Sequence, residues 1–208
     1  MVVRSGGPAA KNFPLGKRLP ENARIVLGAA DRLTLLDNRG TRELRGPGTF
    51  TAIAASVPTQ FDPSRLLGAY RRRGRFGALR GSEEPVRPPT IWHVDVSKSA
   101  NVCVSPANKV VLWRGDVTAD VTLTVTGAGG EWKIAWPRGS ATFGWPDRLP
   151  ATDGAQYSLS LPGGPPTTIR FTTLPQAPAS LEEAASALIA NQCDAQLDLL
   201  VDTARVPG

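Results

Sequence analysis

The clearest pattern in this chain is a two-residue alternation of apolar and polar side chains in its second half. In the stretch 120–126, Val121, Leu123 and Val125 alternate with polar residues. This period is expected of an antiparallel strand that buries one face. Similar runs, with a less regular one at 109–113, occur at 92–96, 132–136, 141–145, 157–161 and 169–171. Seven or eight short strands separated by Gly and Pro turns predict a β-sandwich over residues 90–175.

The first 56 residues show shorter β-prone runs between turn signals. The runs are at 2–4, 24–27, 32–36, 41–44 and 49–51. The stretch 37–40, Asp-Asn-Arg-Gly, is typical of a hairpin loop, because Asn and Gly tolerate the positive φ of tight turns. Residues 1–56 are therefore predicted to form a small β-meander of about five strands.

Residues 57–89 lose this regularity, since Pro and Gly interrupt every apolar run. A structureless stretch of this length inside one compact domain is uncommon. The sequence therefore predicts two β-modules joined by a linker or long loop.

The final segment, 176–208, changes to a helical period. Ser180 and Glu183 fit a capping box, and apolar residues follow at helical spacing from Leu181 to Leu199. One helix over about 181–203 is predicted, with Cys193 in its middle, packed on the sandwich. The fold class is thus mainly all-β, closed by one C-terminal α-helix.

The two cysteines, Cys103 and Cys193, allow two interpretations: a pair of buried thiols, or one disulfide that closes a loop of about 90 residues. We predict the disulfide, because an exported chain with an even cysteine count does not usually leave both thiols free. Two thiols and the single histidine cannot complete a tetrahedral metal shell, so no metal site is expected.

Composition fits a folded globular protein. Hydrophobic residues make up 41% and charged residues 20% of the chain, which is ordinary for folded domains. No stretch approaches the ~18 apolar residues of a membrane span. Residues 1–7 lack the apolar core of a signal peptide, but Met1 directly before a strand-like run is typical of a start codon placed on a shortened sequence. We therefore take the missing signal as uninformative.

The formal net charge of +6 is concentrated in one segment. Seven arginines lie between residues 65 and 87 against Glu83 and Glu84. Arg71, Arg72, Arg73 and Arg75 are candidates for contact with an anionic surface, a protein partner or nucleic acid. The favoured interpretation is a solvated mobile loop, and nucleic acid is the least favoured partner.

Any catalytic hypothesis has to involve His93, the only histidine. His93 and Asp95 share one strand face, opposite Trp92, so a Ser/His/Asp arrangement with Ser97 or Ser99 is conceivable. The favoured interpretation is a solvent-facing polar row. No nucleophile elbow, zinc-protease, Walker or dinucleotide motif occurs in the sequence. We expect no enzyme and no cofactor.

All five tryptophans lie between residues 92 and 145. Trp132, Trp136 and Trp145 fall on neighbouring predicted strands and could form an aromatic platform for a sugar. Their phase matches the apolar rows, which favours core positions.

Two segments resemble known bacterial modules. The run 19–50, with Ala-Arg-Ile-Val-Leu at 23–27, Asp-Arg-Leu-Thr-Leu-Leu at 31–36 and Gly-Pro-Gly-Thr-Phe at 46–50, resembles the FecR-type periplasmic domain. The run 141–161 is similar to the Trp-to-Tyr core of Ig-like modules, and the whole resembles uncharacterised exported proteins of alphaproteobacteria. The resemblance covers about half the chain and implies an exported β-protein, so we expect a periplasmic or secreted location. It does not transfer the signalling role of the FecR family, which depends on a membrane-bound partner.

The leading hypothesis is a non-catalytic binding or scaffold module of the cell envelope that contacts another protein. The alternative is carbohydrate or peptidoglycan binding through exposed tryptophans. A hydrolase built around His93 is less favoured.

Overall fold

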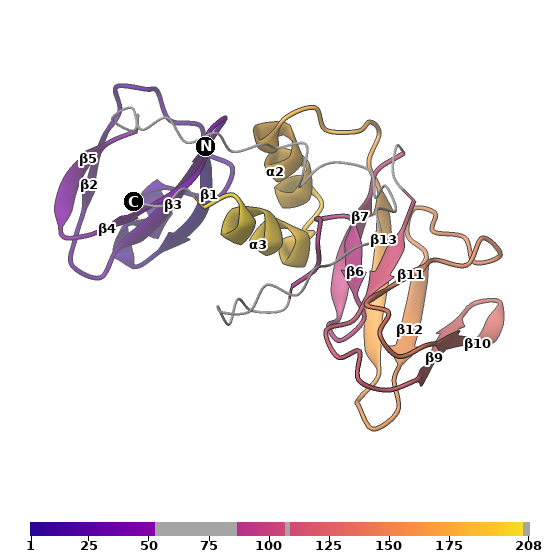
Figure 1. Cartoon of the computed structure of the whole chain (residues 1–208). Helices are drawn as coiled ribbons and strands as arrows, with labels where there is room; N and C mark the ends of the chain where they lie inside the picture. Colours follow the sequence, from indigo (N-terminus) through magenta and orange to yellow (C-terminus); the bar gives the residue numbers. More distant parts are fainter. Residues whose placement is uncertain (53–86, 107–108, 206–208) are drawn as a thin grey trace. The chain divides into compact units, whose positions relative to one another are not determined.

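The computed structural model describes residues 1–52, 87–106 and 109–205 of the chain. The chain divides into two compact units, one formed by Met1–Leu67 with Pro178–Gly208 (unit 1) and the other by Gly68–Ala177 (unit 2). Figure 1 labels their elements along the sequence. Each unit has its own sheets and its own apolar core.

Unit 1 begins with five strands, at the positions that the sequence predicts. They are β1 (Val2–Gly6), β2 (Arg24–Leu27), β3 (Arg32–Asp37), β4 (Gly40–Arg45) and β5 (Gly48–Thr51), with a short 3-10 helix η1 (Pro8–Asn12) after β1. The strands pair as β1-β3-β4 and as β2-β5. Consecutive pairing, as in a meander, therefore holds only for β3 and β4, whose turn closes on Gly40 at a φ of 130°.

The strands of unit 1 bury apolar side chains on more than one face. One cluster comprises Val2, Ile25, Leu27, Leu33, Leu35 and Leu44. Leu36 follows Leu35 directly, so it points to the opposite face of the sheet, and it is also fully buried. The helices α2 (Leu181–Ala190) and α3 (Asp194–Thr203) contact β3 and β4 respectively.

The C-terminal segment thus forms two helices, where the sequence predicted one. The predicted N-cap is confirmed, because Ser180 Oγ accepts the N–H of Glu183 at 3.1 Å. The first helix stops because Gln192 takes a positive φ of 55° and the N–H of Cys193 turns back to the carbonyl of Leu188. Backbone bonds of this kind are typical of helix ends. Cys193 is consequently the N-cap residue of α3 rather than a mid-helix residue.

Both helices belong to unit 1, which differs from the prediction that they pack on the sandwich. The buried Thr41 of β4 donates its N–H to Ala204 O at 2.7 Å and its hydroxyl to Val201 O at 2.8 Å. Arg4 of β1 pairs with Asp198 at 2.6 Å. The helices pack here because β3 has a second apolar face. Without a covering element, the side chain of Leu36 on that face would be exposed to water.

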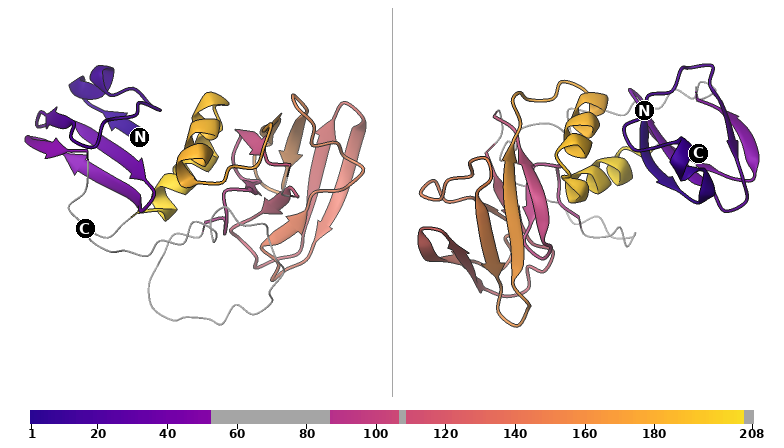
Figure 2. Two further views of the ribbon diagram at one scale, coloured as in Figure 1. Left: turned by 90° about the horizontal axis from the view of Figure 1, so that it is seen from above. Right: turned by 180° about the vertical axis from the view of Figure 1, so that it is seen from behind.

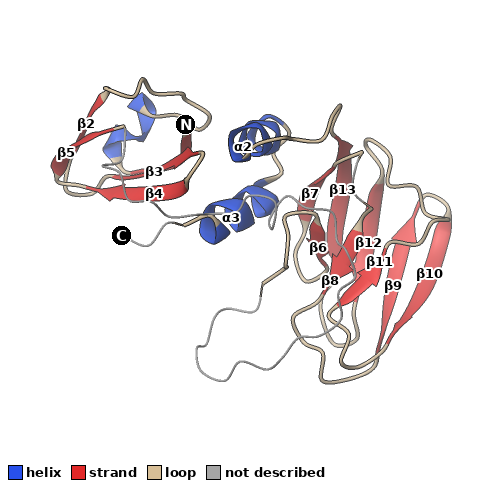
Figure 3. Cartoon of the chain, turned by 45° about the horizontal axis from the view of Figure 1, so that its top comes forward, coloured by secondary structure: helices blue, strands red, loops and turns tan. Residues whose placement is uncertain are grey.

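The described part of unit 2 contains eight strands in two sheets. The strands are β6 (His93–Asp95), β7 (Ala100–Val104), β8 (Val111–Trp113), β9 (Val121–Gly127), β10 (Gly130–Trp136), β11 (Thr142–Gly144), β12 (Gln156–Ser160) and β13 (Thr167–Thr173). The five-stranded sheet has the order β10-β9-β12-β13-β7, and the three-stranded sheet has the order β11-β8-β6. Figure 2 shows both sheets in two further views, and Figure 3 shows strands and loops throughout the described part of this unit.

The two sheets share one apolar core, which confirms the predicted sandwich architecture. Leu123 and Val125 of β9 are fully buried, while Thr122 and Thr126 on the other face are exposed. Leu112 of the three-stranded sheet belongs to the same core cluster. Strand β7 was not predicted from the sequence; it pairs in parallel with β13 and is the last strand on that side of the sheet.

The predicted disulfide between Cys103 and Cys193 is confirmed. Cys103 lies on β7, and both sulfur-bearing side chains are at most 1% exposed. Within the described residues, no helix is long and apolar enough to cross a bilayer.

Candidate functional site

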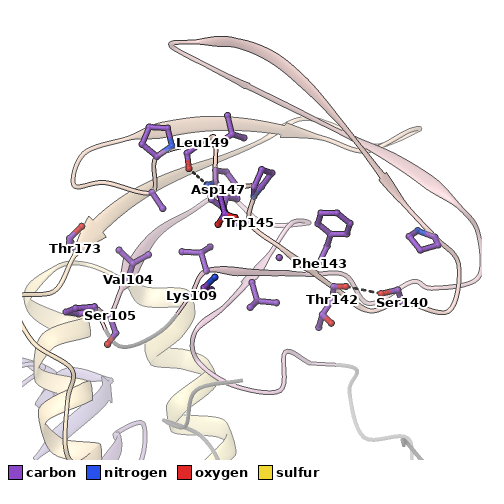
Figure 4. Close-up of a pocket in the computed structure, with 18 residues that line it drawn as sticks. Val104, Ser105, Lys109, Ser140, Thr142, Phe143, Trp145, Asp147, Leu149 and Thr173 are labelled. Carbon is purple, nitrogen blue, oxygen red and sulfur yellow. Dashed lines mark hydrogen bonds between the residues drawn. The ribbon is translucent and has the colours of Figure 1, made fainter. Parts of the chain in front are cut away.

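A groove of about 1230 Å³ opens on unit 2 where the apolar core of the sandwich reaches the surface. Its walls come from the end of β7, the start of β8, strand β11 and the segment 145–151 (Figure 4). Val104, Val110, Phe143 and Trp145 are partly buried residues that pack on the core and also line the groove. The groove therefore exposes the margin of the core to a ligand.

Trp145 is the largest side chain of the groove wall, and it is held in a fixed orientation. Its indole Nε1–H donates to Leu149 O at 2.7 Å, the bond dashed in Figure 4. Its ring makes T-shaped contacts with the rings of Tyr157 and Phe171, at interplanar angles of 69° and 82° and with centroids 5.0 and 5.1 Å away. Edge-to-face contacts of this kind stabilise by about 0.5–1.5 kcal/mol each beyond the area buried.

The segment 145–151 is fixed at a second point. The hydroxyl of Tyr157 donates to Pro150 O at 2.9 Å, and the N–H of Leu149 bonds to Pro146 O. Burial raises the pKa of Tyr157, so the hydroxyl stays protonated and remains a donor. One wall of the groove is thus preorganised by side-chain bonds to its backbone, which lowers the entropy cost of binding.

Apolar residues predominate in the groove lining, alongside six residues with polar or charged side chains. Its charged lining residues are Lys109 and Asp147, both exposed. The Ser140 hydroxyl donates to Thr142 O at 2.9 Å, so it is already used within the wall. A mainly apolar hollow with a few polar groups is the usual setting for a ligand site.

Strand β11 offers backbone groups as well. Ala141 and Trp145 bond through their backbones to Arg114 and Val110, at the two ends of the β8–β11 pairing. Because backbone groups alternate in direction along an antiparallel strand, those of Gly144 point away from β8. A Cβ built at Gly144 meets nothing within 4 Å. An extended segment could therefore lie along this strand.

The structure separates the three tryptophans of the predicted platform. Trp136 is 1% exposed, and its Nε1–H donates to Ser140 O at 2.9 Å. Trp132 and Trp145 are half-buried, and of the three only Trp145 lines the groove. A ring as buried as Trp136 cannot present its face to a sugar.

The prediction of a solvent-facing His93 is wrong, since its side chain is 5% exposed. Its Nδ1 lies 2.9 Å from Thr90 Oγ1. Burial lowers the pKa of His93 to about 4, because the charged imidazolium would lose its water there, so the ring is neutral near pH 7. Trp92 and Val94 on the opposite face are buried too, so β6 is covered on both faces rather than half-buried.

The suggested partners of His93 have other bonds. Asp95 accepts from the N–H and hydroxyl of Ser97, at 3.0 and 2.6 Å, and pairs with Lys98 at 3.3 Å. Ser99 Oγ accepts the N–H of Thr168 at 2.9 Å. The contacts of Asp95 stabilise the turn after β6, so Asp95 has a structural role.

Sequence reasoning missed the most conspicuous polar residue of unit 2, which is Arg114. The side chain is 4% exposed, and its guanidinium donates to the carbonyls of Ser140, Ala119 and Pro137 at 2.8 to 3.1 Å. It also lies 5.2 Å from the ring centre of Trp136. The only signal in the sequence was a charged residue directly after an apolar strand.

Two further predictions concern ligands. Among the described residues, no group of three or more His, Cys, Asp or Glu could hold a metal ion. The arginines Arg71, Arg72, Arg73 and Arg75 lie outside the described residues.

No protein-family model, curated protein or solved structure matches this chain.

Proposed function

We propose that this chain is a non-catalytic binding module of the cell envelope, which takes an extended, mainly apolar segment of another protein into the groove of unit 2. The observation that carries the proposal is the opening of the core at Phe143 and Trp145, next to a strand with outward backbone groups. Peptide recognition commonly combines such main-chain groups with apolar hollows for side chains.

The dimensions and chemistry of the groove favour a peptide over a small polar ligand. Its volume of about 1230 Å³ exceeds the ~300–1,000 Å³ typical of small-molecule sites. Proline residues at 106, 137, 146 and 150 add rigid apolar surface to its lining. With Lys109 and Asp147 as its charged members, the groove offers apolar contact along most of its length and one charge of each sign.

Carbohydrate binding is the second candidate, and Trp145 is the residue that would support it. A sugar platform needs an exposed ring face, whereas Trp145 is half-buried and packs against the rings of Tyr157 and Phe171. We therefore place the peptide first.

An Ig-like assignment of unit 2 belongs to the same proposal. The order β10-β9-β12-β13-β7 supports it, together with the bond from Tyr157, at the start of β12, to a backbone carbonyl seven residues earlier. A tyrosine in this place is a hallmark of immunoglobulin-type sandwiches. For unit 1, the FecR-type likeness of residues 19–50 remains a proposal.

Export to the periplasm or the exterior is likewise proposed, and the disulfide supports it. Disulfides persist in oxidising compartments and are rare in the cytosol. The bond between Cys103 and Cys193 is the feature of this chain that an oxidising compartment would maintain.

The test is a binding map by amide NMR on the full chain. Two sets of probes are titrated separately: synthetic peptides of alternating apolar residues with and without proline, and soluble peptidoglycan fragments. We expect the peptides to shift the amide of Gly144, the indole N–H of Trp145 and the amide of Thr173, and the glycans to leave them unchanged. Peptide-induced shifts confined to residues outside the groove would contradict the proposal. Shifts of groove residues with glycans but not with peptides would contradict it as well.

A blocking variant sharpens this test. Gly144→Trp adds a bulky ring where a Cβ meets nothing within 4 Å, so the fold should tolerate it while the groove is obstructed. Gly6→Trp is the matched control, because a Cβ at Gly6 of β1 also meets nothing within 4 Å. Peptide binding should be lost in the first variant and kept in the second. Equal affinity in both would show that the peptide binds elsewhere.

A further inference from the structure

The outer edge of β10 lies in unit 2 and is unpaired among the described strands. β10 is the last strand of the five-stranded sheet, and no other described strand pairs with its outer side. It spans seven residues, Gly130–Trp136, and is paired with β9 along its whole length. A long, regular edge strand is a template for pairing with another strand.

The direction of the free backbone groups follows from the hairpin register. The turn closes with Gly127 opposite Gly130, so this pair exchanges hydrogen bonds, and the alternation continues through Trp132. The N–H and C=O groups of Glu131, Lys133 and Ala135 therefore point outward. The side chains of these three residues are exposed.

We propose that two copies of this chain pair antiparallel through β10, with Glu131 opposite Lys133 of the partner subunit and Lys133 opposite Glu131 of the partner subunit. This register satisfies the two-fold symmetry of a homodimer, because each contact occurs twice. It forms about four backbone hydrogen bonds between outward groups.

Charge selects this register over its neighbours. In the next register that keeps the outward backbone groups facing each other, Lys133 lies opposite Lys133 of the partner subunit. In the next such register in the other direction, Glu131 lies opposite Glu131 of the partner subunit. Like charges in directly opposite positions destabilise a sheet, whereas opposite charges stabilise it. Within one chain the two side chains already lie 3.7 Å apart on the same face.

The side chains of β10 that face the apolar core are compatible with the same antiparallel pairing. Trp132, half-buried, would meet Trp132 of the partner subunit at the two-fold axis, and paired aromatics favour sheet formation. The partner's indole would also come diagonally beside Ile134, which lines an apolar hollow of about 410 Å³ with Phe143 and Pro146. The hollow would give the added ring an apolar contact.

The experiment measures the oligomeric state of the full chain by sedimentation velocity over a range of concentrations. The wild type should show a monomer–dimer equilibrium. Glu131→Lys and Lys133→Glu should each weaken dimerisation roughly tenfold or more, because both opposite-charge pairs become like-charge pairs. A wild type that is monomeric at every concentration would overturn the proposal.

Charge exchange makes the test specific to the register. An equimolar mixture of the Glu131→Lys and Lys133→Glu variants should form heterodimers, and the double variant should regain the homodimer. Arg170→Glu, at an exposed position of β13 inside the sheet, is the control and changes the net charge by the same amount as Lys133→Glu. Failure of the mixture or the double variant to restore dimers, or loss of the dimer in the Arg170→Glu control, would contradict pairing through β10.

Discussion

Arg114 gives the sharpest test of how the sandwich is held together. Its guanidinium bonds to three carbonyls, one on the connection after β8 and two on the connection after β10. A single side chain thus ties two loops to the end of β8. Arg114→Met keeps an apolar stem of similar length and removes all three bonds and the contact with the Trp136 ring.

The magnitude follows from the surroundings of the acceptors. A hydrogen bond to a charged group contributes ~1.5–3 kcal/mol when both partners are buried. Here Ala119 and Pro137 are exposed and Ser140 is half-buried, so water can replace part of the lost bonding. At about 1 kcal/mol per bond, with about 0.5–1 kcal/mol for the ring contact, Arg114→Met should lower the free energy of unfolding of unit 2 by about 3–4 kcal/mol. Arg114→Lys should cost about 2 kcal/mol, because one ammonium group cannot reach three carbonyls in a planar fork.

The assay is urea unfolding followed by tryptophan fluorescence. All five tryptophans lie within residues 92–145, so the signal reports on unit 2 alone. Arg170→Met is the matched control, since Arg170 is exposed and its replacement should change stability by less than about 0.5 kcal/mol. If Arg114→Met is as stable as this control, or if lysine replaces the arginine without loss, the guanidinium bonds do not hold the loops.

Three further outcomes are expected. Tyr157→Phe should lower the free energy of unfolding of unit 2 by about 1–1.5 kcal/mol through loss of the bond to Pro150 O, and no change in the urea midpoint would refute that role. Trp145→Ala should cost about 3 kcal/mol and Trp145→Phe about 1 kcal/mol, because the ring is half-buried against two aromatic rings; thermal unfolding measures both, and a fully stable alanine variant would show that the ring only lines the groove. The intact protein should weigh about 2 Da less before reduction than after it, and reduction of the Cys103–Cys193 bond should lower stability by about 4–5 kcal/mol on the loop-entropy model, so a mass unchanged by reductant would contradict the disulfide.

The strands of this protein were largely readable from the sequence. Alternation found β9, β10, β12 and β13 because each lies in an antiparallel pair and buries one face. The capping box at Ser180 was readable for a similar reason, since an N-cap bond joins residues three apart. Such features depend on local geometry, which the sequence carries directly.

The candidate functional site was harder to predict from the sequence. The sequence placed Trp145 on a strand of the sandwich, but the groove beside it is formed by β7, β8, β11 and the segment 145–151 together. The structural role of Arg114 could not be predicted from the sequence either, because its three hydrogen-bond acceptors are backbone carbonyls, which every residue possesses. His93 was expected in solvent, since an isolated strand with a polar row does not reveal that both of its faces are covered.

The sequence by itself determined the mainly β class, the positions of most strands and the start of the C-terminal helical segment, and it left the cysteines either free or paired. Only the tertiary structure decided which strands become neighbours, that the helices belong with the N-terminal strands, and where the core opens to the surface. The physical reason is the range of the interactions. Periodicity, caps and turns act between residues a few positions apart, whereas the packing of Leu36 or the bonds of Arg114 and Thr41 depend on groups that folding brings together from distant parts of the chain.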